Sequence, residues 1–183
     1  MATPRGTLSS DQIVDAASDL IAEEGLSKLS MRRLGARLGV DPMALYHHVG
    51  NKQQLLARVL QQTTVDLPDT DPDVPWADEV RRWAIAWWQI VVRNRELVAA
   101  SLVDPAIASG GIPAAEPLTH AVRRSGLDPE TATAAVYLVV DFVHGSALSG
   151  GLDRADERAN ELRAHFERGL DIVIAGIAAE EQT

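Results

Sequence analysis

Residues 30–52 read SMRRLGARLGVDPMALYHHVGNK, and we expect the rest of the chain to support this stretch. Apolar residues recur at spacings of three and four in its first part, which predicts a helix over 30–38. Gly39 follows where a left-handed residue ends a helix and turns the chain. Asp41 and Pro42 then begin a second helix, because aspartate is a good cap and proline fits the first helical position.

The second predicted helix spans 42–49 and is barely two turns long, so its neighbours must hold it in place. Leu45 and Val49 give it one inward face. Two helices joined by a glycine-containing turn form the helix-turn-helix arrangement, whose second helix enters the major groove of DNA. An ordinary helical hairpin has the same spacing, so the spacing alone leaves both interpretations open. The residues on the outward side are Pro42, Met43, Ala44, Tyr46, His47 and His48.

Charge is unevenly distributed along the 183 residues, whose formal net charge is −9. Residues 26–60 carry six basic side chains and one acidic one, whereas residues 61–183 carry 10 basic and 20 acidic ones. A basic end in front of an acidic body orients a protein on a polyanion. The distribution favours a nucleic-acid partner, although charged helix surfaces without a partner remain an alternative.

The sequence of the stretch carries more information than its spacing. Together with the start of the next helix, the stretch contains three motifs: Leu38-Gly39-Val40, Leu45-Tyr46-His47-His48 and Asn51-Lys52-Gln53-Gln54-Leu55-Leu56. This combination closely resembles the N-terminal domain of the TetR family of transcriptional regulators. The family pattern has an L-G-V turn, a recognition helix with L-Y-x-H and an N-K-x-x-L-L entry to the next helix. The resemblance covers about the first 60 residues.

The resemblance implies that this domain binds double-stranded DNA, and it assigns contacts residue by residue. Arg32 suits a bidentate contact with guanine, and Met43 and Ala44 suit apolar contact with a thymine methyl group. Tyr46, His48 and Lys52 suit contacts that position the protein on phosphates. The full set of expected DNA-binding residues is Arg32, Pro42, Met43, Ala44, Tyr46, His47, His48 and Lys52.

Two domains are expected on either side of a proline-rich connector. Residues 1–50 form the predicted helix-turn-helix domain, and a linking helix follows over 51–67. Residues 68–75, PDTDPDVP, cannot form a helix because they hold three prolines in eight positions. Residues 68–183 then form a larger helical domain for ligand binding and dimerisation.

All four tryptophans lie in one predicted helix over 76–94. Aromatic residues at helical spacing usually pack in a core, and that interpretation stands beside a second one. In the second, some of them line a pocket for a small molecule, since pockets are lined by aromatic side chains with a few polar groups. The candidate ligand-binding residues are Trp83, Trp87, Trp88, Leu102, Val140 and His144.

The last two predicted helices, over 129–149 and 154–179, are strongly apolar on more than one side. They have the character of half a four-helix bundle that the same pair from a second chain would complete. The resemblance implies that homodimer, while packing within a single chain is the alternative. The expected interface residues are Val136, Val140, Leu162, Phe166, Leu170 and Val173.

Several classes of protein are disfavoured by what the sequence lacks. The chain has no cysteine, which excludes disulfides and thiolate metal sites, and it shows no secretory signal or membrane-spanning run. Asp141 and His144 are spaced for a shared ligand, but no further metal-ligand motif accompanies them. We therefore expect a cytoplasmic protein that is not an enzyme and that needs no cofactor or metal.

The sequence as a whole predicts an all-α protein of about nine helices. The function expected from the resemblance is a homodimeric, ligand-responsive transcriptional repressor, released from a palindromic operator by a largely apolar small molecule. One alternative is a dimeric all-α protein that binds small molecules without recognising DNA, and another is an all-α enzyme. The identity of the ligand, the operator sequence and the choice between repression and activation are not encoded in any motif.

Overall fold

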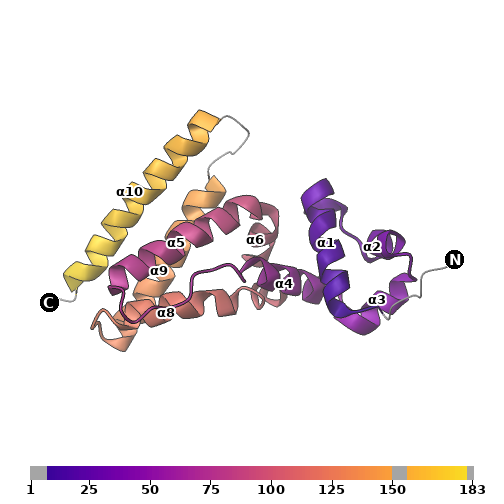
Figure 1. The fold of residues 1–183 in the computed structure, drawn as a ribbon, viewed down its shortest axis with the longest axis horizontal. Helices are drawn as coiled ribbons and strands as arrows, with labels where there is room; N and C mark the ends of the chain where they lie inside the picture. Colours follow the sequence, from indigo (N-terminus) through magenta and orange to yellow (C-terminus); the bar gives the residue numbers. More distant parts are fainter. Residues whose placement is uncertain (1–7, 150–155, 181–183) are drawn as a thin grey trace. The chain divides into compact units, whose positions relative to one another are not determined.

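The computed structural model describes residues 8–149 and 156–180, which form ten α-helices and two short 3-10 helices (Figure 1). The predicted all-α class is confirmed, since those two ranges contain no strand. The described residues contain ten α-helices rather than about nine, because residues 95–108 form two separate short helices. Asp104 caps a new helix there by accepting a hydrogen bond from the backbone N–H of Ala106 at 3.0 Å.

By packing, the chain divides into two compact units, of which the first comprises residues up to 63 together with 96–111. In this unit α1 packs against α2, α3 and α4, and α7 packs against α4. Leu34, Leu45 and Leu55 are fully buried in its core. Its helices are α1 (Ser10–Glu24), η1 (Leu26–Lys28), α2 (Met31–Leu38), α3 (Pro42–Val49), α4 (Lys52–Thr63), α6 (Arg95–Ser101) and α7 (Pro105–Ala108).

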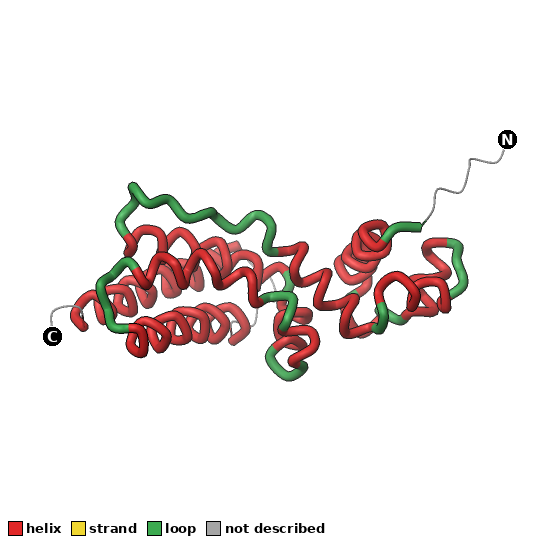
Figure 2. The backbone as a smooth tube through the Cα atoms, turned by 90° about the horizontal axis from the view of Figure 1, so that it is seen from below, coloured by secondary structure: helices red, strands yellow, loops and turns green. Residues whose placement is uncertain are grey.

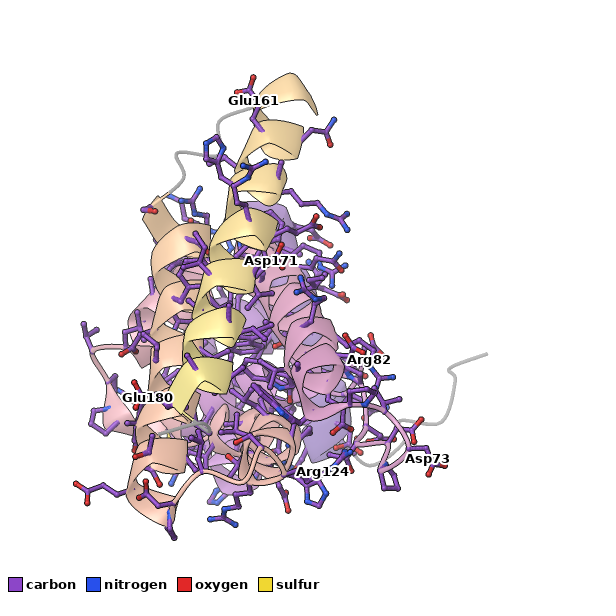
Figure 3. All side chains as sticks on the ribbon, turned by 90° about the vertical axis from the view of Figure 1, so that its left-hand side faces the viewer. Asp73, Arg82, Arg124, Glu161, Asp171 and Glu180 are labelled. Carbon is purple, nitrogen blue, oxygen red and sulfur yellow. The ribbon has the colours of Figure 1, made fainter. Side chains whose placement is uncertain are left out.

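The second unit comprises 64–95 and the residues from 112 onward. Helix α5 packs against α8, α9 and α10, and α10 also lies along α9 (Figure 1). Asp171 of α10 points toward α5, where Arg81 forms an ion pair with it (Figure 3). Its helices are α5 (Trp76–Arg93), η2 (Ile112–Ala115), α8 (Glu116–Arg123), α9 (Pro129–Ser149) and α10 (Asp156–Glu180).

The connection between α4 and α5 is the long non-helical segment that the prolines predict (Figure 2). Helix α4 ends at Thr63, four residues before the predicted end, so the connection spans 64–75. Arg124 binds this segment by donating to the backbone carbonyls of Pro72 at 2.9 Å and Val74 at 2.6 Å. The connector is thereby attached to the second unit.

Residues 96–111 belong to the first unit by packing, although they lie between α5 and α8 in the chain. A Cβ atom built on Gly110 would lie 1.9 Å from the backbone oxygen of Ala57 in α4. Only glycine therefore allows the turn after α7 to approach α4 so closely. The boundary expected near residue 68 separates DNA binding from ligand binding and dimerisation. The division of the chain by packing does not test it, so it stays a prediction.

Candidate DNA-binding surface and effector cluster

Helix α3 is held by its cap and by two buried side chains, as the sequence predicts. Asp41 accepts a hydrogen bond from the backbone N–H of Met43 at 2.8 Å, and Pro42 occupies the first turn. Leu45 and Val49 are buried on the inner face. A two-turn helix held in this way keeps its outer face in a fixed orientation.

The turn between α2 and α3 depends on two glycines. Gly39 takes a left-handed conformation with φ of 68°, which side chains rarely adopt. Gly35 lies inside α2, and a Cβ atom there would lie 2.9 Å from the backbone oxygen of Val40. The sequence analysis identified Gly39 but missed Gly35, whose only signal is a glycine at a helical position that would otherwise favour alanine.

The outer face of α3 is available to a partner. Met43 is 63% exposed, Tyr46 is 40% exposed, and His47 is also exposed. Three further expected residues of this face, Pro42, Ala44 and His48, are half-buried. An exposed row of methionine, tyrosine and histidine on a rigidly held helix has the character of a contact surface.

The three arginines of α2 have different surroundings. Arg33 forms an ion pair with Glu24, and Arg37 forms two hydrogen bonds with Glu23 at 2.6 and 2.8 Å. The hydrogen bond from Arg37 holds the pKa of Glu23 below its usual value. Within 8–149 and 156–180, Arg32 forms no ion pair and is exposed. Arg32 is thus the α2 arginine that is best placed to bind DNA.

Lys52 has a contact that the sequence did not predict. Its ammonium group donates a hydrogen bond to the backbone carbonyl of Leu29 at 2.7 Å, and its side chain is half-buried. The start of α4 is therefore tied to the turn that precedes α2. The expected phosphate contact of Lys52 stays a prediction, but the side chain also has this positioning role within the protein.

Three of the expected ligand-binding residues lie together in the second unit. The rings of Trp83 and Trp87 are stacked 6.1 Å apart, and the ring of His144 lies 5.8 Å from that of Trp87. Trp87 donates from Nε1 to Nε2 of His144 at 3.2 Å. Trp83 donates to the carbonyl of Ala114 at 2.7 Å. We call Trp83, Trp87 and His144 the candidate effector cluster.

Trp88 differs from the other two tryptophans. It stacks on Phe166 of α10 with ring centroids 5.3 Å apart and is only 8% exposed. Its indole N–H is buried and has no hydrogen-bond partner among the described residues. A buried donor without an acceptor costs free energy, so this N–H would gain from an acceptor supplied by a ligand or water.

The remaining ligand candidates are placed less favourably. Leu102 belongs to the first unit and is exposed, so the structure does not place it in the candidate effector cluster. Val140 is half-buried on α9. Burial lowers the pKa of His144, and the nearby Asp141 carboxylate partly opposes this effect. His144 is consequently neutral at pH 7, and its Nε2 can accept the hydrogen bond from Trp87.

Two of the expected dimer-interface residues are not available to a second chain. Phe166 is 3% exposed and Leu170 is fully buried within this chain, because the ring of Phe166 packs against Trp88 and Phe142. The expectation for this pair was therefore wrong, since the apolar seam of α10 faces α9 and α5. The other four, all half-buried, are Val136, Val140, Leu162 and Val173.

Large apolar side chains of α9 and α10 are also exposed. They are Tyr137 and Leu138 of α9 and Ile172 of α10. Among the described helices, α9 alone is long and apolar enough to cross a membrane by length and composition, and 28% of its most apolar window is buried within the chain. Its contacts with α5, α8 and α10 are those of a helix inside a folded protein, with one side left uncovered.

Comparisons with known proteins agree with this arrangement. Residues 13–59 match the model of the N-terminal domain of the bacterial regulatory proteins of the tetR family. The chain is 29% identical, over 87% of its length, to the HTH-type transcriptional repressor DrrR1 of Streptomyces coeruleorubidus, and the match spans 60% of that protein.

Two solved structures resemble the fold over nearly the whole chain. BioQ with its natural double-stranded DNA operator is 28% identical with a TM-score of 0.76, and the match covers 94% of this chain and 99% of BioQ. The Streptomyces coelicolor TetR family protein ActR in complex with actinorhodin is 26% identical with a TM-score of 0.79, and the match covers 97% of this chain and 100% of ActR. This chain is therefore similar to TetR family regulators in the sequence of its N-terminal domain and, over nearly its whole length, in its fold.

Proposed function

We propose that the protein is a homodimeric transcriptional repressor that leaves a palindromic operator when a small molecule binds its second domain. The observation that carries the proposal is the outer face of α3, with exposed Met43, Tyr46 and His47, together with Arg32 of α2, which forms no ion pair among the described residues. The repressor name of DrrR1 and the operator bound to BioQ support it. In this proposal, residues 1–50 bind DNA, 51–67 link the domains, and 68–183 bind the effector and dimerise.

The proposed DNA contacts follow the surroundings of each side chain. Arg32 binds a guanine edge, because among the described residues it is the arginine of α2 that forms no ion pair with an acidic side chain. Met43 makes apolar contact with bases, and Tyr46 and His47 contact the groove or phosphates. Two copies related by a two-fold axis would place two α3 helices in neighbouring major grooves. Pro42, Ala44, His48 and Lys52 complete the proposed surface.

The proposed effector is a largely apolar, aromatic molecule with at least one hydrogen-bond acceptor. The aromatic side chains around Trp88 favour a largely apolar ligand, and its indole N–H, which has no partner among the described residues, favours a carbonyl or hydroxyl oxygen. The actinorhodin bound to ActR is consistent with a ligand of this class. The molecule can shift the protein away from DNA only by binding one conformation more tightly than the other.

The proposed dimer interface is the uncovered surface of α9 and α10, formed by Tyr137, Leu138 and Ile172. Gly145 and Gly176 lie on the same helices, and a Cβ atom built on either would have no neighbour within 4 Å. Small residues beside large apolar ones allow two helices to approach closely when a second chain covers them. As a DNA-binding regulator, the protein would act in the cytoplasm, and we assign no enzymatic reaction to it.

A gel-shift titration tests the proposal. The probe is the DNA immediately upstream of the protein's own gene, and the competitor is a fragment of unrelated sequence. We expect saturable binding whose affinity falls steeply as salt rises, because the contacts with phosphates release counterions. Equal affinity for both fragments at every salt concentration would remove the support for operator recognition.

A further inference from the structure

Carboxylates of α1 bind two of the three arginines of α2. Arg37 donates from Nη1 and Nη2 to the two carboxylate oxygens of Glu23 at 2.6 and 2.8 Å, which is the bidentate geometry of a strong arginine–carboxylate pair. Arg33 forms an ion pair with Glu24. All four side chains belong to the first unit, so these contacts follow from the packing of that unit alone.

The spacing of the arginines divides them between two sides of α2. Arg33 and Arg37 are four residues apart, which places both on the side of the helix that faces α1. Arg32 is rotated from Arg33 by about 100°, because an α-helix has 3.6 residues per turn. Among the described residues, Arg33 and Arg37 are therefore neutralised within the protein, whereas Arg32 forms no ion pair.

The contact between Arg37 and Glu23 is stronger than an ordinary surface ion pair. An exposed pair of flexible side chains contributes little, whereas two parallel hydrogen bonds fix the guanidinium on its carboxylate. A second carboxylate, that of Asp19, lies 3.9 Å from Nη2 of Arg37 and adds to the attraction. The pKa of Arg37 is raised, chiefly by the hydrogen bond with Glu23. The positive charge of Arg37 is consequently held against α1.

The same two arginines would otherwise be suited to binding phosphate. In a helix-turn-helix, the first helix crosses the DNA backbone, and a guanidinium binds a phosphate through the same paired hydrogen bonds that bind a carboxylate. Each arginine that contacts a phosphate adds affinity for every sequence, because the backbone is the same at each base pair. A carboxylate that already occupies the guanidinium removes this sequence-independent contribution.

We propose that Glu23 and Glu24 keep the affinity for DNA of unrelated sequence low, by occupying Arg37 and Arg33 in place of phosphates. The inference rests on the proposed function, because that function assigns α2 to the DNA-binding surface. Arg32 is then the arginine of α2 that contacts DNA, so more of the binding depends on a base. The two glutamates thus favour specificity without contacting DNA themselves.

Fluorescence anisotropy with a labelled duplex of unrelated sequence tests this proposal on the full-length protein. In Glu23→Gln, the released Arg37 should contact one phosphate in each subunit. We expect the affinity for the duplex at about 0.1 M salt to rise about tenfold, and the slope of log K against log salt to steepen by about 1–2. Glu24→Gln should act similarly through Arg33, and the double variant should show both gains.

Asp11→Asn is the matched control. Asp11 is an exposed acid of the same helix and forms no ion pair among the described residues, so its replacement changes the net charge by the same amount. A gain that Glu23→Gln shares with this control is an effect of net charge. In an Arg37→Met background, Glu23→Gln should gain no more than Asp11→Asn, because the cation that it would release is absent.

The proposal is overturned if Glu23→Gln and Glu24→Gln show the same salt slope as the Asp11 control. Pairs that only join α1 to α2 would lower the free energy of unfolding when broken and would leave the slope unchanged, and urea denaturation of each variant detects that role. If Glu23→Gln fails to fold, Glu24→Gln tests the claim through Arg33. Failure of the proposed function is a different result, in which the wild-type protein does not prefer the DNA upstream of its own gene.

Discussion

Arg124, which follows the end of α8, donates a hydrogen bond to Glu79 of α5, whose carboxylate is almost completely buried. The other carboxylate oxygen of Glu79 accepts from the backbone N–H of Asp71, so the connector, α5 and α8 meet at this pair. Arg124 and Asp73 lie at the same end of the unit (Figure 3). The Arg124–Glu79 pair therefore fixes the path of the proline-rich connector, which has no helical hydrogen bonds of its own.

Replacing Arg124 should therefore destabilise the second unit. Arg124→Met leaves the buried carboxylate of Glu79 with only Arg82, 3.9 Å away, as a cation and frees the backbone carbonyls of Asp71, Pro72 and Val74. We therefore expect a loss of roughly 3 kcal/mol in the free energy of unfolding. Urea denaturation followed by tryptophan fluorescence measures this loss. Arg123→Met, at the exposed neighbouring position, is the control, and an equal effect of both variants would contradict the assigned role.

Operator recognition should depend on Arg32 more than on the other arginines of α2. Arg32→Ala should cost about 1–3 kcal/mol of operator binding and relax specificity at one base pair, because a bidentate guanine contact is lost. Competition gel shifts with operators changed at single base pairs measure both effects.

Arg33→Ala is the matched control for Arg32→Ala, since Arg33 is paired with Glu24 of α1. The Arg33→Ala protein should bind the operator with nearly unchanged base preference. If Arg32→Ala weakens binding equally on every sequence, then Arg32 contacts phosphate and does not read a base.

The sequence predicted local structure well wherever a short-range rule applies. The bounds of α3 and α9 are as predicted, because Asp-Pro marks the start of each and glycine or small residues follow its end. Contacts between distant residues carried no such signal. Nothing in the sequence indicated that Glu96 accepts from Leu26 or that Phe166 stacks on Trp88, since these contacts depend on how whole helices pack.

The tryptophans show the same limit at the candidate site. Their helical spacing predicted a shared side of α5, and Trp83 and Trp87 do stack on each other. Which indole N–H groups find an acceptor depends on other elements: a carbonyl before α8 serves Trp83, and a histidine of α9 serves Trp87. A period of 3.6 residues cannot reveal such partners.

Gly110 should be sensitive to the addition of a single methyl group. In Gly110→Ala the new Cβ atom overlaps the backbone of Ala57, so the turn after α7 must move away from α4. We expect a loss of about 1–3 kcal/mol in the free energy of unfolding, as in other overpacked sites. Chemical denaturation of the purified protein measures it.

Gly111→Ala is the matched control for the glycine substitution, because a Cβ atom there would lie 3.3 Å from Cδ2 of the flexible Leu60 side chain and would not overlap a backbone. It should change the free energy of unfolding by less than about 1 kcal/mol. A neutral Gly110→Ala variant would show that the turn tolerates displacement from α4.

The exposed apolar surface of α9 and α10 should determine the oligomeric state. Leu138→Glu places a charge on this surface without disturbing the core, since Leu138 is exposed in a single chain. We expect sedimentation equilibrium to change from dimer to monomer, and operator affinity to fall with it, because two linked recognition helices bind more tightly than one. Val103→Glu, at an exposed apolar residue of the first unit, is the control, and a dimeric Leu138→Glu protein would place the interface elsewhere.

His144 should make stability depend on pH below neutrality. Burial holds its pKa below the ordinary 6.5, so the unfolded chain takes up a proton at a higher pH than the folded one does. Its stabilising contribution is present above about pH 6.5 and is lost as the pH falls from there toward the lowered pKa, where protonation also removes the acceptor for Trp87. His144→Gln keeps an acceptor but does not titrate, so the difference in unfolding free energy between wild type and variant should shrink from pH 7.5 to pH 5.5 as measured by urea denaturation. A difference that stays constant across this range would mean that His144 has the same pKa in both states.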